Sequence, residues 1–192
     1  DTRLILSDRL MAEISDRTDP SELIVVFKRP TPTLQDIKIS PAPFVVILDR
    51  PSNTGNLGSL VRSCDAFGVD AVITTGHGVD IYDPQVIRAS LGGIFHLQLI
   101  HEPSSAEIMS WLDRLKNDVN DLEVIGTDSD GADSLRDKEL RKPTAVLFGN
   151  EATGLSVALR EYVDRIVAIP IDGAVNSLNL ACAASIILYS VK

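Results

Sequence analysis

Three short polar clusters contain the residue types that could do chemistry, and each cluster follows an apolar run. The first, "PSNTGNLGSLVR", includes Asn56 and Arg62. The second, "GNEATGLS", places Glu151 between two glycines, and the third, "NSLN", contains Ser177 and Asn179. Amide, hydroxyl, carboxylate and guanidinium groups can hold and orient a polar ligand. These groups make the three clusters candidates for a ligand-binding or catalytic site.

Each cluster also fits a purely structural interpretation when it is taken alone. Asn56 is placed to N-cap a helix, and Arg62 then becomes a solvated side chain on that helix. In the same way, Glu151 faces solvent or caps the next helix, and Ser177 and Asn179 are ordinary capping residues. The joint position of the three clusters at strand ends is the stronger argument for a site.

Four glycines in these clusters have expected local roles. Gly58 lies one helical turn before Arg62, and we expect it to leave room for a group to approach the guanidinium. Gly68 is placed to end the same helix. We expect Gly149 to let a ligand approach the backbone, and Gly154 to adopt a conformation that other residues resist.

The apolar pattern predicts alternating strands and helices from Phe44 onward. Strands are expected at 44–48, 70–74, 95–100, 122–126, 145–148 and 165–169. Helices are expected near 57–67, 84–91, 104–117, 155–162 and 176–190. This alternation is typical of an α/β fold with a mostly parallel sheet and helices on both faces. Ligands bind beyond the carboxyl ends of the strands in such sheets, which is where the clusters lie.

The N-terminal part of the chain has a different pattern. "SELIVVFKRP" predicts one short strand, and the prolines at 30, 32, 41 and 43 indicate a linker. We therefore expect an N-terminal segment at 1–43 and one α/β domain at 44–192. Because the sequence begins at Asp1 and not at Met, we expect the segment to be the remnant of a longer N-terminal region.

Composition and charge narrow the class of protein. Of the 192 residues 44% are hydrophobic and 23% charged, which is ordinary for a globular α/β protein. The net charge of −9 counts against nucleic acid as a partner, unless a local patch or a missing segment supplies basic residues. Residues 174–191 carry no charge, but interspersed Asn and Ser favour a buried or interface helix over a membrane span. No signal peptide is visible, so we expect a cytoplasmic protein without membrane contact.

The cysteines, histidines and known ligand motifs give no further site. Cys64 and Cys182 stand in apolar contexts, which favours small buried residues in a reducing compartment. The three histidines have no metal-ligand spacing, and His96 is expected in a strand, so we expect no metal. The sequence also has neither a P-loop nor the G-x-G-x-x-G dinucleotide fingerprint.

Taken together and in this order, the clusters resemble the three motifs of the SpoU (TrmH-type) RNA ribose methyltransferases of the SPOUT superfamily. The resemblance covers residues 44–190. It rests on the following residues: Asn56, Gly58, Arg62 and "DAFG"; Gly149-Asn150-Glu151 with Gly154-Leu155; and Ile169-Pro170 with Ser177-Leu178-Asn179. "IRASLGG" also resembles a segment of that family.

The resemblance implies properties that the pattern alone does not predict. They are a deep C-terminal trefoil knot, S-adenosylmethionine bound in that knot, a homodimer with the site near its interface, and methyl transfer to a ribose 2′-OH of rRNA or tRNA. By the same resemblance, the cofactor-binding positions are Thr127, Gly149, Ile169, Ile171 and Leu178. The implied catalytic positions are Asn56, Arg62, Glu151, Ser177 and Asn179. We expect Arg62 to hold the target phosphate, because a guanidinium keeps its proton, and Glu151 to orient Arg62 or Asn56.

Two other readings stay open at this point. The chain could be a non-catalytic RNA-binding member that kept the fold. It could also be a small-molecule α/β enzyme with an anion site at the helix start at 56–58, which accounts better for the acidic charge but leaves the third cluster unexplained.

Overall fold

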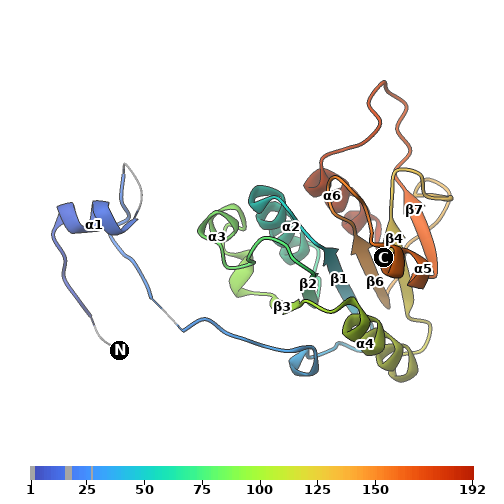
Figure 1. Ribbon diagram of the computed structural model, residues 1–192, viewed down its shortest axis with the longest axis horizontal. Coiled ribbons are helices and arrows are strands. Elements are labelled where there is room, and N and C mark those ends of the chain that lie inside the picture. Colours follow the sequence, from blue (N-terminus) through green and yellow to red (C-terminus); the bar gives the residue numbers. More distant parts are fainter. Residues whose placement is uncertain (1–2, 16–18, 27) are drawn as a thin grey trace. The chain divides into compact units, whose positions relative to one another are not determined.

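A computed structural model describes residues 3–15, 19–26 and 28–192 of the chain (Figure 1). The chain divides into two compact units, Asp1–Thr31 and Pro32–Lys192. The first unit contains helix α1 (Asp8–Ser15), which has no buried residue. The predicted strand in "SELIVVFKRP" is wrong for the described residues, since none of 21–26 and 28–30 is in a strand. An extended segment becomes a strand only when a second strand satisfies its backbone groups.

The second unit is built on a seven-stranded sheet in which every pair is parallel. In chain order its strands are β1 (Phe44–Asp49), β2 (Ala71–Thr75), β3 (Gln98–Glu102), β4 (Glu123–Thr127), β5 (Asp133–Ser134), β6 (Thr144–Phe148) and β7 (Arg165–Ala168). Their order across the sheet is β3-β2-β1-β6-β4-β7-β5. The predicted α/β class with a parallel sheet is confirmed.

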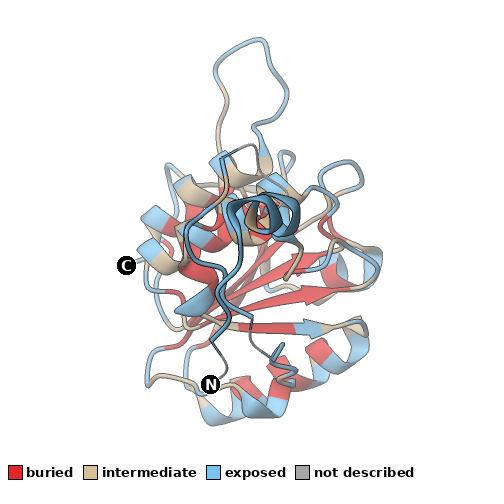
Figure 2. Cartoon of the chain, turned by 90° about the vertical axis from the view of Figure 1, so that its left-hand side faces the viewer, coloured by how far each residue is buried: buried red, intermediate tan, exposed pale blue. Residues whose placement is uncertain are grey.

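Helices cover both faces of this sheet, so the strands lie between two layers (Figure 2). The helices are α2 (Thr54–Ala66), α3 (Pro84–Ala89), α4 (Ser105–Asp118), α5 (Val157–Tyr162) and α6 (Leu180–Ser190), with short 3₁₀ turns η1 (Leu34–Asp36) and η2 (Gly93–Phe95). Residues of α2, α3 and α6 join one core cluster, and residues of α4 and α5 join the other. Strand β1 shows why: Phe44, Val46 and Leu48 enter the first core, whereas Val45 and Ile47 enter the second. Alternate side chains of a strand point to opposite faces, and both faces are buried here.

Several predicted boundaries are wrong in informative ways. Helix α2 begins at Thr54 and its N-cap is Asn53, not Asn56. Helix α6 begins at Leu180 instead of 176, and Asn179 caps it. His96 follows η2 and lies outside β3, where it accepts or donates one hydrogen bond with Asp65.

One strand and one cysteine also differ from expectation. Strand β5 was missed, because two residues are too few to show a periodicity. Cys64 is buried as predicted, but Cys182 is exposed on α6.

Residues 32–43 belong to the second compact unit, in which Leu34 is buried in a core. The division into an N-terminal segment at 1–43 and a catalytic domain at 44–192 stays a prediction.

Candidate functional site

A cavity of about 700 Å³ lies beyond the carboxyl ends of β6, β4 and β7, on the side that the parallel sheet predicts for a ligand. Its walls are the residues that follow these strands and the start of α6. All five predicted cofactor-binding residues line it: Thr127, Gly149, Ile169, Ile171 and Leu178. Four of the five predicted catalytic residues line it as well: Asn56, Glu151, Ser177 and Asn179. The structure brings nine of the ten residues together, and their individual roles stay predictions.

A chain of hydrogen bonds joins the three polar clusters at this cavity. The Nδ2 of Asn179 donates to the Oδ1 of Asn56 across 2.9 Å. The Nδ2 of Asn56 in turn donates to the Oε1 of Glu151 across 3.2 Å. The second carboxylate oxygen of Glu151 accepts hydrogen bonds from the backbone N–H and the hydroxyl of Ser52. Of the two expected partners of Glu151, the structure therefore selects Asn56 and not Arg62.

The carboxyl group of Glu151 is held in its ionised form. Burial raises its pKa, but hydrogen bonds from Ser52 and Asn56 lower it by more, so the pKa of Glu151 lies below its ordinary value. An ionised carboxylate accepts hydrogen bonds and donates none. Glu151 is therefore suited to orient the amide of Asn56 at neutral pH.

An ion pair between a buried aspartate and a partly exposed arginine fixes the loop that carries Glu151. Asp49, at the end of β1, is 3% exposed and pairs with the guanidinium of Arg50, with Oδ1–Nε 3.0 Å and Oδ2–Nη2 3.1 Å. Arg50 also donates to the carbonyl oxygen of Gly154, and Asp49 accepts from the backbone N–H of Ser156 at 2.6 Å. At the other end of the loop, Asn150 donates to the carbonyl oxygen of Arg50 at 2.7 Å. The 149–156 loop is thus tied to the end of β1 at both of its ends.

The two glycines of this loop have different reasons to be glycine. Gly154 has a φ of +67°, which confirms its predicted unusual conformation. Gly149 lines the cavity, so the expected approach of a ligand to its backbone stays a prediction, and the loop itself gives a second reason for this glycine. A Cβ on Gly149 would collide with the backbone of Gly154 and Leu155. Gly149 is required because the loop folds back against its own start, where Asn150 and Gly154 pair backbone to backbone.

Arg62 is the one predicted catalytic residue that lies away from the cavity. Six residues along a helix advance about 9 Å and turn a side chain by about 240°, so Arg62 and Asn56 leave α2 on different faces. Arg62 is exposed, and none of the described residues makes a hydrogen bond or ion pair with its guanidinium. The expected role of Gly58 is wrong, because its free side faces α3. A Cβ there would lie 2.5 Å from the Cβ of Ala89 and 2.6 Å from the carbonyl oxygen of Val86.

Sequence reasoning missed three polar residues of this site. Ser52 binds Glu151 from 99 residues away, and Asp49 with Arg50 holds the Glu151 loop. Their only sequence signal is the place of "LDRPS" directly after a buried strand, and that place does not identify a partner. Asp128 also lines the cavity, where it forms an ion pair with Arg160.

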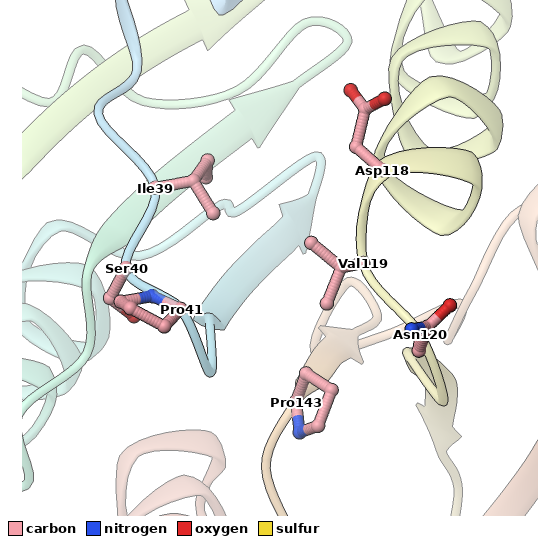
Figure 3. Close-up of a pocket in the computed structure, with 7 residues that line it drawn as sticks. All are labelled: Ile39, Ser40, Pro41, Asp118, Val119, Asn120 and Pro143. Carbon is pink, nitrogen blue, oxygen red and sulfur yellow. The ribbon is translucent and has the colours of Figure 1, made fainter.

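A second cavity, of about 530 Å³, lies near the amino ends of β1, β4 and β6 (Figure 3). Four of its seven lining residues are apolar. The figure labels all seven: Ile39, Ser40, Pro41, Asp118, Val119, Asn120 and Pro143. It contains none of the predicted site residues. Within the described part of the chain, no group of three or more His, Cys, Asp or Glu side chains could hold a metal ion. Among the described helices, none has the length and apolarity that crossing a membrane requires.

Comparison with known proteins agrees with this geometry. The sequence model of the SpoU rRNA Methylase family matches residues 43–189. A 23S rRNA (uridine(2479)-2′-O)-methyltransferase of Streptomyces viridochromogenes is 36% identical over 188 residues, which are 97% of this chain and 66% of that protein. The 23S rRNA (guanosine(2553)-2′-O)-methyltransferase RlmP of Bacillus subtilis (strain 168) is 27% identical over 188 residues, 98% of this chain and 71% of that protein. The chain thus spans about two thirds of the length of these relatives.

Solved structures give the same result. The SpoU methyltransferase AviRb from Streptomyces viridochromogenes, in complex with the cofactor AdoMet, has a TM-score of 0.90 and 36% identity. That match covers 97% of this chain and 71% of AviRb. An AdoMet-bound rRNA methyltransferase from Sinorhizobium meliloti has a TM-score of 0.86 and 28% identity, and covers 96% of this chain and 69% of that one.

The fold is that of the SPOUT class of α/β methyltransferases. Within this class, the chain belongs to the SpoU rRNA Methylase family. The family was predicted from the three motifs, and the prediction is confirmed.

Proposed function

We propose that this chain catalyses the transfer of a methyl group from S-adenosylmethionine to a ribose 2′-hydroxyl of rRNA. The observation that carries the proposal is the Asn179–Asn56–Glu151 hydrogen-bond chain at the edge of the strand-end cavity. It joins all three motifs of the family in one place. Two relatives are named for 2′-O-methylation of 23S rRNA, which supports rRNA as the substrate. An rRNA substrate also implies action in the cytoplasm.

The lining of the cavity suits this cofactor. Its apolar lining residues include Val167, Ile169, Ile171 and Leu178, which suit a flat adenine ring. The lining also includes the loops at 127–129 and 149–154, whose backbone groups and hydroxyls suit the ribose and the amino-acid end. When bound, the cofactor would supply a methyl carbon on a sulfonium, to which the ribose oxygen bonds as the carbon–sulfur bond breaks and the neutral thioether leaves. The chain itself must place that oxygen and stabilise its negative charge.

The proposed roles follow from the contacts. Asn56 and Asn179 bind the reacting ribose at the cavity edge, and Ser177 lies beside them in the lining. Glu151 orients Asn56. Arg62 holds an RNA phosphate with its planar guanidinium. A guanidinium keeps its proton in proteins, so Arg62 is not the group that removes the hydroxyl proton.

A second copy of the chain is part of the proposal. Helix α6 carries an exposed apolar stripe at Cys182, Ile186 and Tyr189, spaced four and three residues apart, and Tyr189 packs edge-on against Phe67. Such a stripe lies on one face of a helix and is stabilised when another apolar surface covers it. We infer a homodimer through this face of α6.

The proposal is tested by incubating the chain with methyl-labelled S-adenosylmethionine and either 23S rRNA or tRNA at low ionic strength. We expect label in the 23S rRNA, and calorimetry should show one cofactor bound per chain. Cofactor binding without transfer to either RNA would support the non-catalytic RNA-binding reading instead. Absence of cofactor binding would contradict the proposal outright.

A further inference from the structure

Ser52 holds the Glu151 carboxylate with two groups of the same residue. Its hydroxyl lies 2.6 Å from Oε2 of Glu151, and its backbone N–H donates to the same oxygen across 3.1 Å. A hydroxyl–carboxylate distance of 2.6 Å is typical of a strong, charge-assisted hydrogen bond. No motif of the three clusters includes Ser52 as a functional position. The contact nevertheless connects the segment before α2 directly to the loop after β6.

The two ends of the hydrogen-bond chain force one direction on the amides between them. At one end, the ionised Glu151 accepts only, so Asn56 must turn its Nδ2 toward it and its Oδ1 toward Asn179. At the other end, the Oδ1 of Asn179 accepts from the backbone N–H groups of Ala181 and Cys182, 2.9 and 3.4 Å away. Asn179 must therefore turn its Nδ2 toward Asn56. Both ends demand the same orientation, so neither amide can be reversed without breaking a hydrogen bond.

This direction decides what the two asparagines offer to a substrate. A side-chain amide has two N–H groups and one oxygen. Asn56 and Asn179 each use one N–H and their oxygen within the chain. Each keeps one N–H for which the described residues provide no acceptor. The pair therefore presents donors at the cavity edge, and donors suit an oxygen that gains negative charge as it reacts.

We propose that Ser52 is a positioning residue of the methyl transfer, which fixes Glu151 so that Asn56 and Asn179 present N–H donors to the reacting ribose oxygen. The proposal rests on the proposed function and adds a residue to it. Removing the Ser52 hydroxyl leaves Glu151 with fewer fixed contacts and lets the Asn56 amide turn. Hydrogen bonding by Ser52 also lowers the pKa of Glu151, which gives the role a titration signature.

The test compares Ser52→Ala, Ser52→Thr and a control, Thr54→Val. Thr54 lies two residues away, and its hydroxyl donates to Gln85 and not to the site. In Ser52→Ala we expect kcat for labelled-methyl transfer to fall about tenfold, as for other residues that orient a catalytic group. The KM and Kd for S-adenosylmethionine should change less than twofold. The acid limb of the kcat–pH profile should move to higher pH, because Glu151 loses a hydrogen bond that stabilises its ionised form.

Ser52→Thr keeps the hydroxyl and should restore both kcat and the acid limb, and Thr54→Val should leave both unchanged. The proposal is overturned if Ser52→Ala keeps the wild-type kcat and acid limb, or if Thr54→Val changes them equally. Carbon-detected NMR titration of Glu151 distinguishes failure of the Ser52 role from failure of the proposed methyl transfer. If the wild type transfers no methyl group but Ser52→Ala still raises the Glu151 pKa, the Ser52–Glu151 contact is supported and the proposed reaction is not. If the Glu151 pKa is unchanged in Ser52→Ala, the role of Ser52 is refuted.

Discussion

At the scale of single residues, Glu151 is the group on which the site's polarity depends. Its pKa lies below the ordinary value for glutamate, so it keeps its charge to a lower pH than a glutamate in solvent does. The ionised form is lost only as the pH falls through this lowered folded-state pKa. Activity that depends on the Glu151–Asn56 contact should therefore be constant near neutral pH and decline only in acid.

Glu151→Gln should lower methyl transfer by about tenfold or more while the fold is kept. A glutamine amide has one oxygen and one NH₂ group, so it cannot accept from Ser52 and Asn56 on two separate oxygens. The NH₂ group would face a donor, which turns the Asn56 amide or breaks the contact. Circular dichroism and the Kd for S-adenosylmethionine should match the wild type. Wild-type kcat in this variant would show that Glu151 orients nothing that matters for the reaction.

Arg62→Lys should also lose most activity and still fold, because lysine is a point charge without the planar fork of arginine. The matched control is Arg114→Lys. Arg114 is also exposed and, among the described residues, has no ion pair, but it lies on α4 at the opposite face of the sheet. Steady-state transfer assays on both variants decide the point. Full turnover by Arg62→Lys, or an equal loss in Arg114→Lys, would remove Arg62 from the site.

The three polar clusters, together with the family that they resemble, were enough to predict which residues line the cavity. Nine of the ten predicted residues line it. The contact of Ser52 with Glu151 was out of reach, because nothing in a local pattern pairs two polar residues 99 positions apart. The same limit applies to Asp49, which looks like an ordinary strand-end aspartate until the structure places it against Arg50 and Ser156.

At the scale of elements, α2 shows how a correct helix can be given wrong local roles. Asn53 and Asn56 both suit an N-cap, and the sequence offers no rule to choose between them. The structure uses Asn53 as the cap and leaves the Asn56 side chain free to reach Glu151 and Asn179. Gly58 was expected to leave room beside Arg62, but the group that packs against it is α3, through the Cβ of Ala89 and the carbonyl oxygen of Val86. A glycine in a helix indicates that some group packs closely against it, but it does not identify that group.

Gly58→Ala should destabilise the chain by about 1–3 kcal/mol, since the added methyl group would overlap Ala89 and the backbone of α3. Alanine's better helix propensity offsets only a part of this. Chemical denaturation measures the effect. Gly173→Ala is the control, because no atom lies within 4 Å of the position its Cβ would take. Equal stability of the two variants would contradict the packing described for α2 and α3.

At the scale of the whole molecule, net charge was the least informative property. The value of −9 argued against RNA, yet it does not describe the local charge: some acidic groups, such as Asp49, Glu123 and Asp128, form ion pairs with arginines. Arg62 on α2 and Arg88 on α3 are exposed and without an ion pair among those residues, and these two helices pack together. A phosphate backbone responds to such local unpaired cations more than to the total charge.

The trefoil knot is a further whole-chain property. It depends on how the chain is threaded, which no periodicity of the sequence encodes, and it stays a prediction.

The inferred homodimer is a prediction at this scale. Ile186→Asp places a charge in the apolar stripe of α6 and should convert a dimer to a monomer, as measured by light scattering after gel filtration. The control, Val157→Asp, changes an exposed valine at the start of α5 and should leave the mass unchanged. A wild-type monomer at micromolar concentration, or a dimer that survives Ile186→Asp, would exclude this face as the interface.

The position of the transferred methyl group tests the central claim most directly. 23S rRNA labelled by this chain is hydrolysed with alkali, which cleaves RNA only where a free 2′-hydroxyl can attack the neighbouring phosphate. A 2′-O-methyl group blocks that attack, so the account predicts that the label remains in alkali-resistant dinucleotides. Label recovered in single nucleotides would place the methyl group on a base and contradict the proposed reaction.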